Sequence, residues 1–365
     1  MSGPPARRAG GLRLSHGGYG CRVPSPSRAT RHAGVPIAAR GPGWSYRSDT
    51  DAPSLFGRRQ PGVETPRLAH LRLAVFDLEA PARDVLSGWT ALAETLLGED
   101  LTITFGLGPR AFTDARRPVR LRALPSFDGD ALDPARCGGD VAVHVTAADP
   151  DRAAAVVDAL SDAARGGVAP RTTLVGSLGR APGDAPTGTP RDPLGFRDGT
   201  HNLRRGRDLD RHIWVDRGDR TGMVGGTYLV VRRIELDVAA FTAQPLAEQE
   251  RLIGRRRATG APLGGRGEFD PAPLEAFPET SHVRLASPRT NRVPPMLRRS
   301  YGSGDGLVFL AFMRDPARQF VPVQRRLSQQ DPLARFSRHT ASAVFAVPPG
   351  APPGGFIGEQ LLGPR

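Results

Sequence analysis

Three segments of the sequence combine acidic, basic and turn-forming residues in patterns that could support chemistry. The first is the stretch 193–202, in which Gly195 and Gly199 flank Phe196-Arg197-Asp198. Glycine lets the backbone turn sharply and approach a flat ligand where a side chain would block it. Asp-Gly is also a common turn dipeptide whose carboxylate caps its own backbone. The spacing alone therefore leaves both a plain turn and a ligand-facing Asp198 open.

The other two segments follow about eighty residues later and carry a histidine and an arginine pair. His282 lies in the segment Ser281-His282-Val283-Arg284-Leu285-Ala286-Ser287-Pro288-Arg289, and the arginines lie in Met296-Leu297-Arg298-Arg299-Ser300-Tyr301. An imidazole can bind iron through one nitrogen while the other donates a hydrogen bond that raises its basicity. A lone histidine is more often structural than a ligand, so the residues around His282 must show whether it binds a metal.

These segments resemble the dye-decolorising (DyP-type) haem peroxidases. Gly195-Phe196-Arg197-Asp198-Gly199-Thr200 matches the GxxDG motif of that family, and the segments around His282 and Arg298 match in order and distance. The resemblance covers roughly residues 56–362. It implies haem b as the cofactor, one iron protoporphyrin IX per chain, with His282 as the proximal iron ligand. The most similar branch is the exported one, which includes the deferrochelatase/peroxidase of iron-uptake systems.

The resemblance assigns Asp198 and Arg298 to the distal side, where hydrogen peroxide reacts. Cleaving the O–O bond heterolytically needs a base that takes a proton from one oxygen and returns it to the other, and a positive donor for the developing charge. An aspartate can serve if a nearby arginine keeps it ionised. Counting back from Tyr301 in the Leu-Arg-Arg-x-Tyr pattern favours Arg298, which leaves Arg299 as a surface or propionate contact.

Further haem contacts are implied by the resemblance. They are Gly199, Thr200, His201, Ser287, Pro288 and Arg289. His201 could contact a propionate, have no role in the site, or act as a second titrating group on the distal side. Arg233, at the end of a strand, is expected to pair with a propionate or to be solvated. The residues expected either to line the pocket or to pack the core are Val308, Phe309 and Phe312, and those expected either to carry electrons or to pack the core are Trp214, Tyr228 and Tyr301.

The hydrogen-bond partner of His282 is expected to be Asp315 or Gln324, and the sequence does not choose between them. The other histidines of the ordered part need no function. We expect His70, His144, His212 and His339 at surface or turn positions.

Composition limits the function classes. The formal charge of +13 comes from 50 basic residues, all of them arginine, so a P-loop lysine and Schiff-base chemistry are excluded. Residues 1–60 carry +8 of that charge, but no aromatic-interleaved basic patch follows, so nucleic acid is not the expected partner. Cys21 and Cys137 are the only cysteines, which excludes a thiolate metal cluster. The expected partners are hydrogen peroxide, small-molecule electron donors and an iron-uptake permease system, and a homo-oligomer is compatible with the sequence.

Three parts of the chain are expected. Residues 1–55 form an Arg/Gly/Pro-rich tail, predicted to be disordered, 56–205 the N-terminal half ending in the GxxDG motif, and 206–365 the haem-binding half. Arg7-Arg8 fits a twin-arginine export signal, but Arg13 interrupts the apolar segment such a signal needs, so export and a cytoplasmic location both stay open, as does a different start codon. No apolar run is long enough for a membrane span.

Apolar spacing predicts the elements of each half. In the first half it predicts strands over 70–78, 101–107, 140–146 and 171–175, and helices over 82–97 and 149–165. In the second half it predicts strands over 226–236, 306–312 and 341–347, and helices over 238–256 and 317–327. The first order, β-α-β-β-α-β, is that of a ferredoxin-like half. Periodicity alone indicates an α+β fold; the resemblance implies two ferredoxin-like halves in a dimeric α/β-barrel-like arrangement, with haem in the C-terminal half.

Overall fold

The N-terminal half is a four-stranded antiparallel sheet with two helices. The computed structural model describes residues 52–204, 206–216, 218–271 and 274–363, so the predicted tail and export segment lie outside it except for residues 52–55. In chain order the elements are β1 (His70–Leu78), α1 (Ala82–Leu96), β2 (Leu101–Leu107), β3 (Val141–Ala147), α2 (Pro150–Ala163) and β4 (Val168–Ser177). The strand order is β4-β1-β3-β2, which is ferredoxin-like.

The C-terminal half repeats this plan with a strand in two pieces. Its elements are β5 (Thr227–Leu236), α4 (Val238–Thr242), α5 (Leu246–Ile253), α6 (His282–Leu285), α7 (Pro288–Asn291), β6 (Leu297–Arg298), β7 (Tyr301–Ser303), β8 (Gly306–Met313), α8 (Pro316–Gln330) and β9 (Ser337–Val347). Strand β5 pairs with both β9 and β8, and β6 and β7 follow one another along β8. The short helix α3 (Gly206–His212) precedes β5, and α9 (Glu359–Leu362) follows β9.

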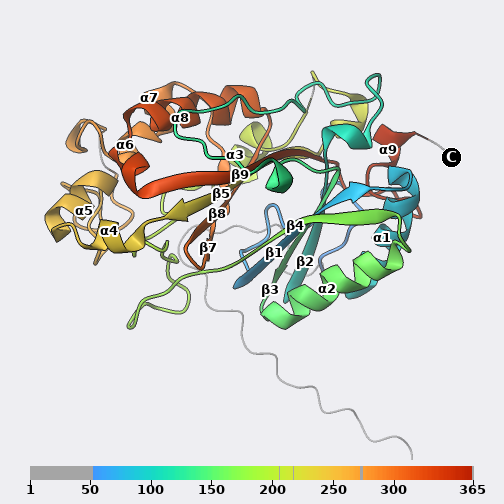
Figure 1. Cartoon of the computed structure of the whole chain (residues 1–365), viewed down its shortest axis with the longest axis horizontal. Helices are drawn as coiled ribbons and strands as arrows, with labels where there is room; N and C mark the ends of the chain where they lie inside the picture. The colour runs from blue at the N-terminus through green and yellow to red at the C-terminus, as the bar shows by residue number, and fades with distance from the viewer. Residues whose placement is uncertain (1–51, 205, 217, 272–273, 364–365) are drawn as a thin grey trace, which may run out of the picture. The chain divides into compact units, whose positions relative to one another are not determined.

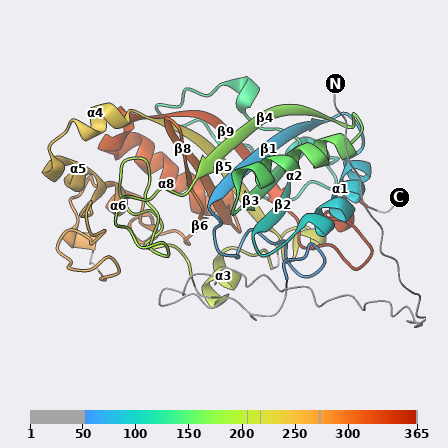
Figure 2. The ribbon, with the colours of Figure 1, turned by 90° about the horizontal axis from the view of Figure 1, so that it is seen from below.

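The two sheets join edge to edge and close on themselves. Single pairs connect them, Leu107 with Ala346 and Ser177 with Gly302, and the β5–β8 pairing completes the ring. Side chains of alternate strand residues fill its interior, where Leu229 and Phe312 are fully buried. Helices α1 and α2 lie beside β1 to β4, and α6, α7 and α8 gather beside β5 and β8 (Figures 1 and 2). The predicted fold of two ferredoxin-like halves is confirmed.

Two expectations for local structure are wrong. The helix predicted over 238–256 is interrupted because Pro245, which lacks an N–H and precedes Leu246, starts a new helix, and Gly254 with φ +96° ends it. His144 is not at the surface: it points into the closed sheet, is 1% exposed, and its ring meets the edge of Phe312. No helix among the described residues is long and apolar enough to cross a membrane.

Candidate functional site

His282 is held by a carboxylate from the far end of α8. His282 is the first residue of α6, and its Nδ1 lies 2.6 Å from Oδ2 of Asp331, the residue that ends α8. The other oxygen of Asp331 accepts the backbone N–H of Leu333, so the carboxylate itself is fixed. The expected partners were wrong. Asp315 instead caps the start of α8, at the opposite end from Asp331, by accepting the N–H groups of Ala317 and Arg318. Gln324 is buried within α8.

The environment of His282 leaves its second nitrogen available. Burial lowers the pKa of the imidazole, but the charge and hydrogen bond of Asp331 outweigh burial and raise the pKa above its ordinary value. The side chain is 40% exposed, although the surrounding protein desolvates the imidazole. No described residue offers Nε2 a hydrogen bond. This is the arrangement by which a histidine binds a metal through Nε2.

The turn that carries Asp198 depends on two left-handed glycines. Gly195 has φ +89° and Gly199 has φ +105°, a region that residues with a Cβ rarely adopt. The turn is closed by hydrogen bonds from Gly195 N–H to the Asp192 carbonyl and from Asp198 N–H to the Pro190 carbonyl. A Cβ on Gly199 would also come within 3.1 Å of Arg67. Asp198 is thus presented by backbone geometry that the two glycines permit.

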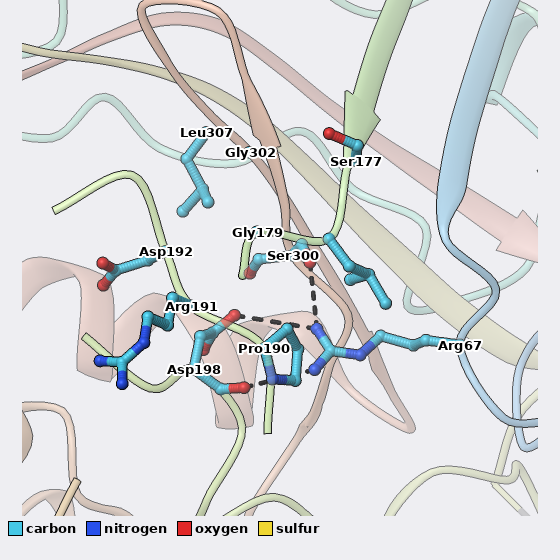
Figure 3. A pocket seen from close by; sticks show the side chains of 11 residues that line it. Arg67, Ser177, Gly179, Pro190, Arg191, Asp192, Asp198, Ser300, Gly302 and Leu307 are labelled. Carbon is cyan, nitrogen blue, oxygen red and sulfur yellow. Dashed lines mark hydrogen bonds and ion pairs between the residues drawn. The ribbon is translucent and has the colours of Figure 1, made fainter. Parts of the chain in front are cut away.

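Arg67, which the sequence did not single out, anchors Asp198. Its guanidinium donates to the carbonyls of Ser300 and Asp198 and lies 3.8 Å from the Asp198 carboxylate (Figure 3). Behind this contact is a cavity of about 10 Å³, roughly the volume that one water needs. Arg67 precedes β1, 131 positions before Asp198, and is one of 50 arginines, so no local pattern marks it.

Strand register decides between the two adjacent arginines. Arg298 pairs with Ala311 and Leu297 with Phe312, so Arg298 and Arg299 point to opposite faces of the sheet. Arg299 is 2% exposed, points into the closed sheet and donates to the Val63 carbonyl, so its expected place at the surface or a propionate is wrong. Arg298 is the arginine on the outer face.

Asn202 ties β6 to the Asp198 turn. Its side chain donates to the Arg298 carbonyl and accepts the Arg298 N–H, at 2.6 and 3.0 Å. Burial lowers the pKa of the Arg298 guanidinium, Asp198 raises it and Arg67 lowers it. Arg298 in turn lowers the pKa of His282. Arg298 therefore lies within electrostatic range of His282, Asp198 and Arg67, and its guanidinium finds no hydrogen-bond partner among the described residues.

A second carboxylate lies in the Asp198 turn. Burial, together with the charge of Asp198, raises the pKa of Asp192 to about 7, although the Phe196 N–H donated to its Oδ1 opposes the shift. It lines the same small cavity as Asp198. Sequence reasoning missed it because Asp192-Pro193 is an ordinary start of a turn.

The other predicted contact residues have varied surroundings. Thr200 donates to Glu268, and Ser287 caps α7 by accepting the N–H of Arg289. Pro288 is the first residue of that helix. Partial burial and the charges of several arginines, Arg255 and Arg298 first, lower the pKa of His201 to about 4, so it is neutral near pH 7.

Arg233 is separated from this group by the sheet. It lies opposite Val308 on β5, on the interior face, and its guanidinium pairs with Asp305. Arg298 lies on the other face, so the structure does not bring the two arginines together.

The residues present fit a haem group. A histidine made basic by a carboxylate offers one free nitrogen, the charge of Arg298 acts on this histidine, and the charge of Asp198 acts on Arg298. Among the described residues no group of three or more histidine, cysteine or acidic side chains could hold a bare metal ion. Iron brought in by a macrocycle with one axial histidine is consistent with this donor set.

Comparisons with known proteins agree with this chemistry. Residues 60–176 match the family model "Dyp-type peroxidase, N-terminal" and residues 189–352 match "Dyp-type peroxidase, C-terminal". The chain is 37% identical to the dye-decolorizing peroxidase of Thermobifida fusca, over 83% of each chain, and 30% identical to the deferrochelatase of Escherichia coli K12, over 84% of this chain and 86% of that one.

Solved structures agree as well. The fold superimposes on DtpA from Streptomyces lividans with a TM-score of 0.81 and 34% identity, covering 86% of this chain and 98% of that one. A DyP-type peroxidase from Cellulomonas bogoriensis gives a TM-score of 0.77 at 32% identity, covering 86% and 99%. The chain therefore belongs to the dye-decolorising (DyP-type) peroxidases, haem-dependent oxidoreductases that act on peroxide.

Proposed function

We propose that the chain oxidises dyes and phenolic donors by single electrons at the expense of hydrogen peroxide, with His282 as the proximal ligand and Asp198 and Arg298 on the distal side. The observation that supports the proposal is that Arg298 lies within electrostatic range of both the His282–Asp331 pair and Asp198. Bound haem would supply the iron at which the peroxide O–O bond breaks.

The chain's own residues would prepare peroxide for this cleavage. Asp198 accepts a proton from one peroxide oxygen and returns it to the other as that oxygen leaves. Arg298 stabilises the negative charge on the leaving oxygen, and its lack of a protein partner leaves all its donors available. Asp331 keeps a strong hydrogen bond on Nδ1 of His282, which makes Nε2 a better electron donor.

Arg67 and Asn202 are positioning residues in this account. Arg67 holds the Asp198 backbone and faces its carboxylate, while Asn202 fixes the backbone of Arg298 from the same turn. Their hydrogen bonds connect three segments of the chain. The carboxylate of Asp198 and the guanidinium of Arg298 are therefore held in a fixed relative position. Preorganised charge of this kind needs no rearrangement during the reaction.

A second candidate function is release of iron from haem with the macrocycle left intact. The similarity to the Escherichia coli deferrochelatase favours it, and the same three residues, Asp198, His282 and Arg298, would serve. The two functions differ in product: one yields an oxidised donor, the other free iron and protoporphyrin. The higher identity to the dye-decolorizing peroxidase of Thermobifida fusca makes oxidation of donors the first choice.

Replacing Asp198 by asparagine tests the proposal. The variant should keep haem, because Asn preserves the shape of the turn, and should lose about 100-fold or more in the peroxidase kcat/KM, since general acid–base catalysis contributes 10²–10⁴-fold. Asp192→Asn is the matched control: it removes a carboxylate from the same turn, keeps an acceptor for the Phe196 N–H, and should retain activity. Equal activity of Asp198→Asn and wild type would remove Asp198 from the mechanism.

A further inference from the structure

The interior of the closed sheet holds an arginine whose hydrogen-bonding capacity is only partly used. Arg299 is 2% exposed, and its Nη1 donates to the Val63 carbonyl at 2.8 Å. Its other two donor nitrogens, Nε and Nη2, are buried and find no hydrogen-bond partner among the described residues. Buried polar groups in proteins nearly always have a partner. Two unpaired nitrogens on one guanidinium therefore indicate that something other than the chain contacts them.

The charge of Arg299 is unbalanced as well. No carboxylate of the described chain forms an ion pair with it, and Tyr301 and Arg67 are the side chains that act on its pKa. Burial lowers the pKa of Arg299 to about 10, so the guanidinium stays protonated at neutral pH. Arg67 is itself positive and faces the carboxylate of Asp198. Because a fully buried arginine in proteins is nearly always paired, this site lacks a negative charge.

Tyr301 supplies a second inward-facing donor but not that negative charge. Arg299 donates its backbone N–H to Leu310, and Tyr301 pairs with Val308, so both side chains enter the interior from the same edge of β8. Tyr301 is 1% exposed, and its hydroxyl has no hydrogen-bond partner of good geometry among the described residues. Burial raises the pKa of this phenol, so it keeps its proton and can donate.

His144, the third polar group of this interior, is neither a counter-charge nor an anion ligand. Burial, followed by the charge of Arg299, lowers its pKa to about 3, so the ring is neutral. The Thr104 hydroxyl donates to the Pro61 carbonyl at 2.5 Å, and its oxygen therefore accepts from His144 Nδ1 at 3.3 Å. That tautomer leaves a lone pair on Nε2, which accepts hydrogen bonds and repels an anion.

The surroundings restrict the missing partner to something small. The interior is otherwise filled by apolar side chains, among which Leu229, Leu310 and Phe312 are at most 1% exposed. A water molecule could accept from the two nitrogens of Arg299, but it would leave the charge uncompensated in an apolar environment. One unpaired guanidinium calls for one negative charge. A small monovalent anion meets both requirements.

We propose that the closed sheet binds a chloride ion between the Nε and Nη2 of Arg299 and the hydroxyl of Tyr301. Hydrogen bonds from a charged donor to an anion are the stronger kind, and the ion compensates the buried guanidinium. The site is separate from the proposed haem site, because Arg298 points to the opposite face of the sheet. An ion that binds the folded chain and not the unfolded one stabilises the fold.

Chemical denaturation in two salts measures this binding in solution. The haem-loaded protein is first dialysed into gluconate and is then unfolded at increasing chloride and constant ionic strength. Gluconate supplies the same ionic strength but is too large for a packed interior. The denaturation midpoint should rise with chloride concentration, and this dependence yields an apparent Kd. A midpoint that does not change with chloride would contradict the proposal.

Three variants assign the effect to the interior. Arg299→Met removes the charge and its donors, so the apparent Kd for chloride should rise at least about tenfold. Arg298→Met is the matched control: it removes the same charge one residue earlier, on the other face, and should keep the chloride dependence of the wild type. Tyr301→Phe removes one hydroxyl and keeps the charge, and should raise the apparent Kd severalfold.

Two results of these measurements would overturn the site. One is an equal chloride dependence in the Arg299 and Arg298 variants, which would place the ion elsewhere. The other is an unchanged apparent Kd in Tyr301→Phe, which decides the question even if Arg299→Met does not fold. Neither result involves turnover, so the chloride site and the proposed peroxidase function can fail independently.

Anomalous diffraction from crystals of the haem-loaded protein grown in bromide would locate the ion. Bromide replaces chloride in such sites and scatters anomalously. We expect a peak within hydrogen-bonding distance of the Arg299 guanidinium and the Tyr301 hydroxyl, and no peak there in Arg299→Met. Bromide found only at the haem or on the outer surface would overturn the proposal.

Discussion

Asp331 and His282 are 49 positions apart in the sequence, and a 2.6 Å hydrogen bond joins them. The bond comes from the end of α8, where the same carboxylate also caps the next turn of chain. Its geometry fixes the orientation of the imidazole and determines which nitrogen stays available. The orientation of the proposed proximal histidine thus depends on the position at which α8 ends.

Replacing Asp331 by asparagine should weaken haem binding. Asparagine keeps an oxygen for the Leu333 N–H, but it removes the negative charge that raises the basicity of His282. Loss of such a partner typically costs about 10–100-fold in metal affinity or activity. Titration of the apo-protein with haem, followed by absorbance, measures the effect. Asp315→Asn at the other end of α8 should bind haem like the wild type; equal loss in both variants would show that the helix, not the hydrogen bond, is responsible.

Substitutions of the adjacent residues Arg298 and Arg299 should have different effects on the rate of reaction with peroxide. Arg298→Met should slow the reaction with peroxide by about 10²–10³-fold, the usual cost of removing a donor aimed at developing charge. Arg299→Met, a substitution inside the closed sheet, should leave that rate within about threefold, because its guanidinium points to Val63. Stopped-flow mixing of haem-loaded protein with peroxide gives both rates. A slower Arg299 variant beside a normal Arg298 variant would reverse the assignment.

Arg67→Gln should impair both stability and catalysis. The carbonyls of Asp198 and Ser300 lose their charged donor, which should lower the free energy of unfolding by about 1–3 kcal/mol. The Asp198 turn should also lose its fixed position, so we expect the peroxide rate to fall about tenfold or more. Arg180→Gln is the control, since Arg180 also donates to two carbonyls but is exposed. Chemical denaturation and peroxide kinetics should show no comparable change there.

His144 should make the protein less stable in acid. Burial, followed by the charge of Arg299, lowers the pKa of His144 to about 3, whereas the unfolded chain has the ordinary value of 6.5. Because the unfolded state binds the proton more readily between these values, stability is complete above about pH 6.5 and is lost as pH falls toward 3. The loss from pH 7 to pH 5 should be about 1–2 kcal/mol.

His144→Gln is the test of that acid sensitivity. Glutamine cannot take up the proton, so the difference in unfolding free energy between pH 7 and pH 5 should shrink in the variant. The histidines outside the closed sheet remain in both proteins and cancel in the comparison. The same pH dependence in variant and wild type would show that another group governs acid unfolding.

Much of the fold follows from local patterns. The apolar pattern placed β1 and β2 at their observed residues, although β2 is buried along its whole length, and the order of elements led to the ferredoxin-like halves. Strands β6 and β7 were not predicted, since two and three residues carry no periodicity and their pairing comes from β8. The helix break at Pro245 was visible in the sequence but was outweighed by the apolar spacing.

The site was predictable only where residues close in sequence act together. Asp198, His282 and Arg298 each lie in a short motif, whereas Arg67 and Asp331 act through contacts over 131 and 49 positions. Arg299 and Arg233 were placed incorrectly or left open because which face a strand residue occupies depends on register, which pairing fixes.

The most direct test of the central claim is the absorption spectrum of the haem-reconstituted protein before and after one equivalent of hydrogen peroxide, for wild type and His282→Ala. The account predicts a Soret band in the wild type that shifts on adding peroxide and returns when a phenolic donor is added, and a weakened or altered haem spectrum in the variant. Equal haem binding by wild type and His282→Ala, or a Soret band that peroxide leaves unchanged, would contradict the account.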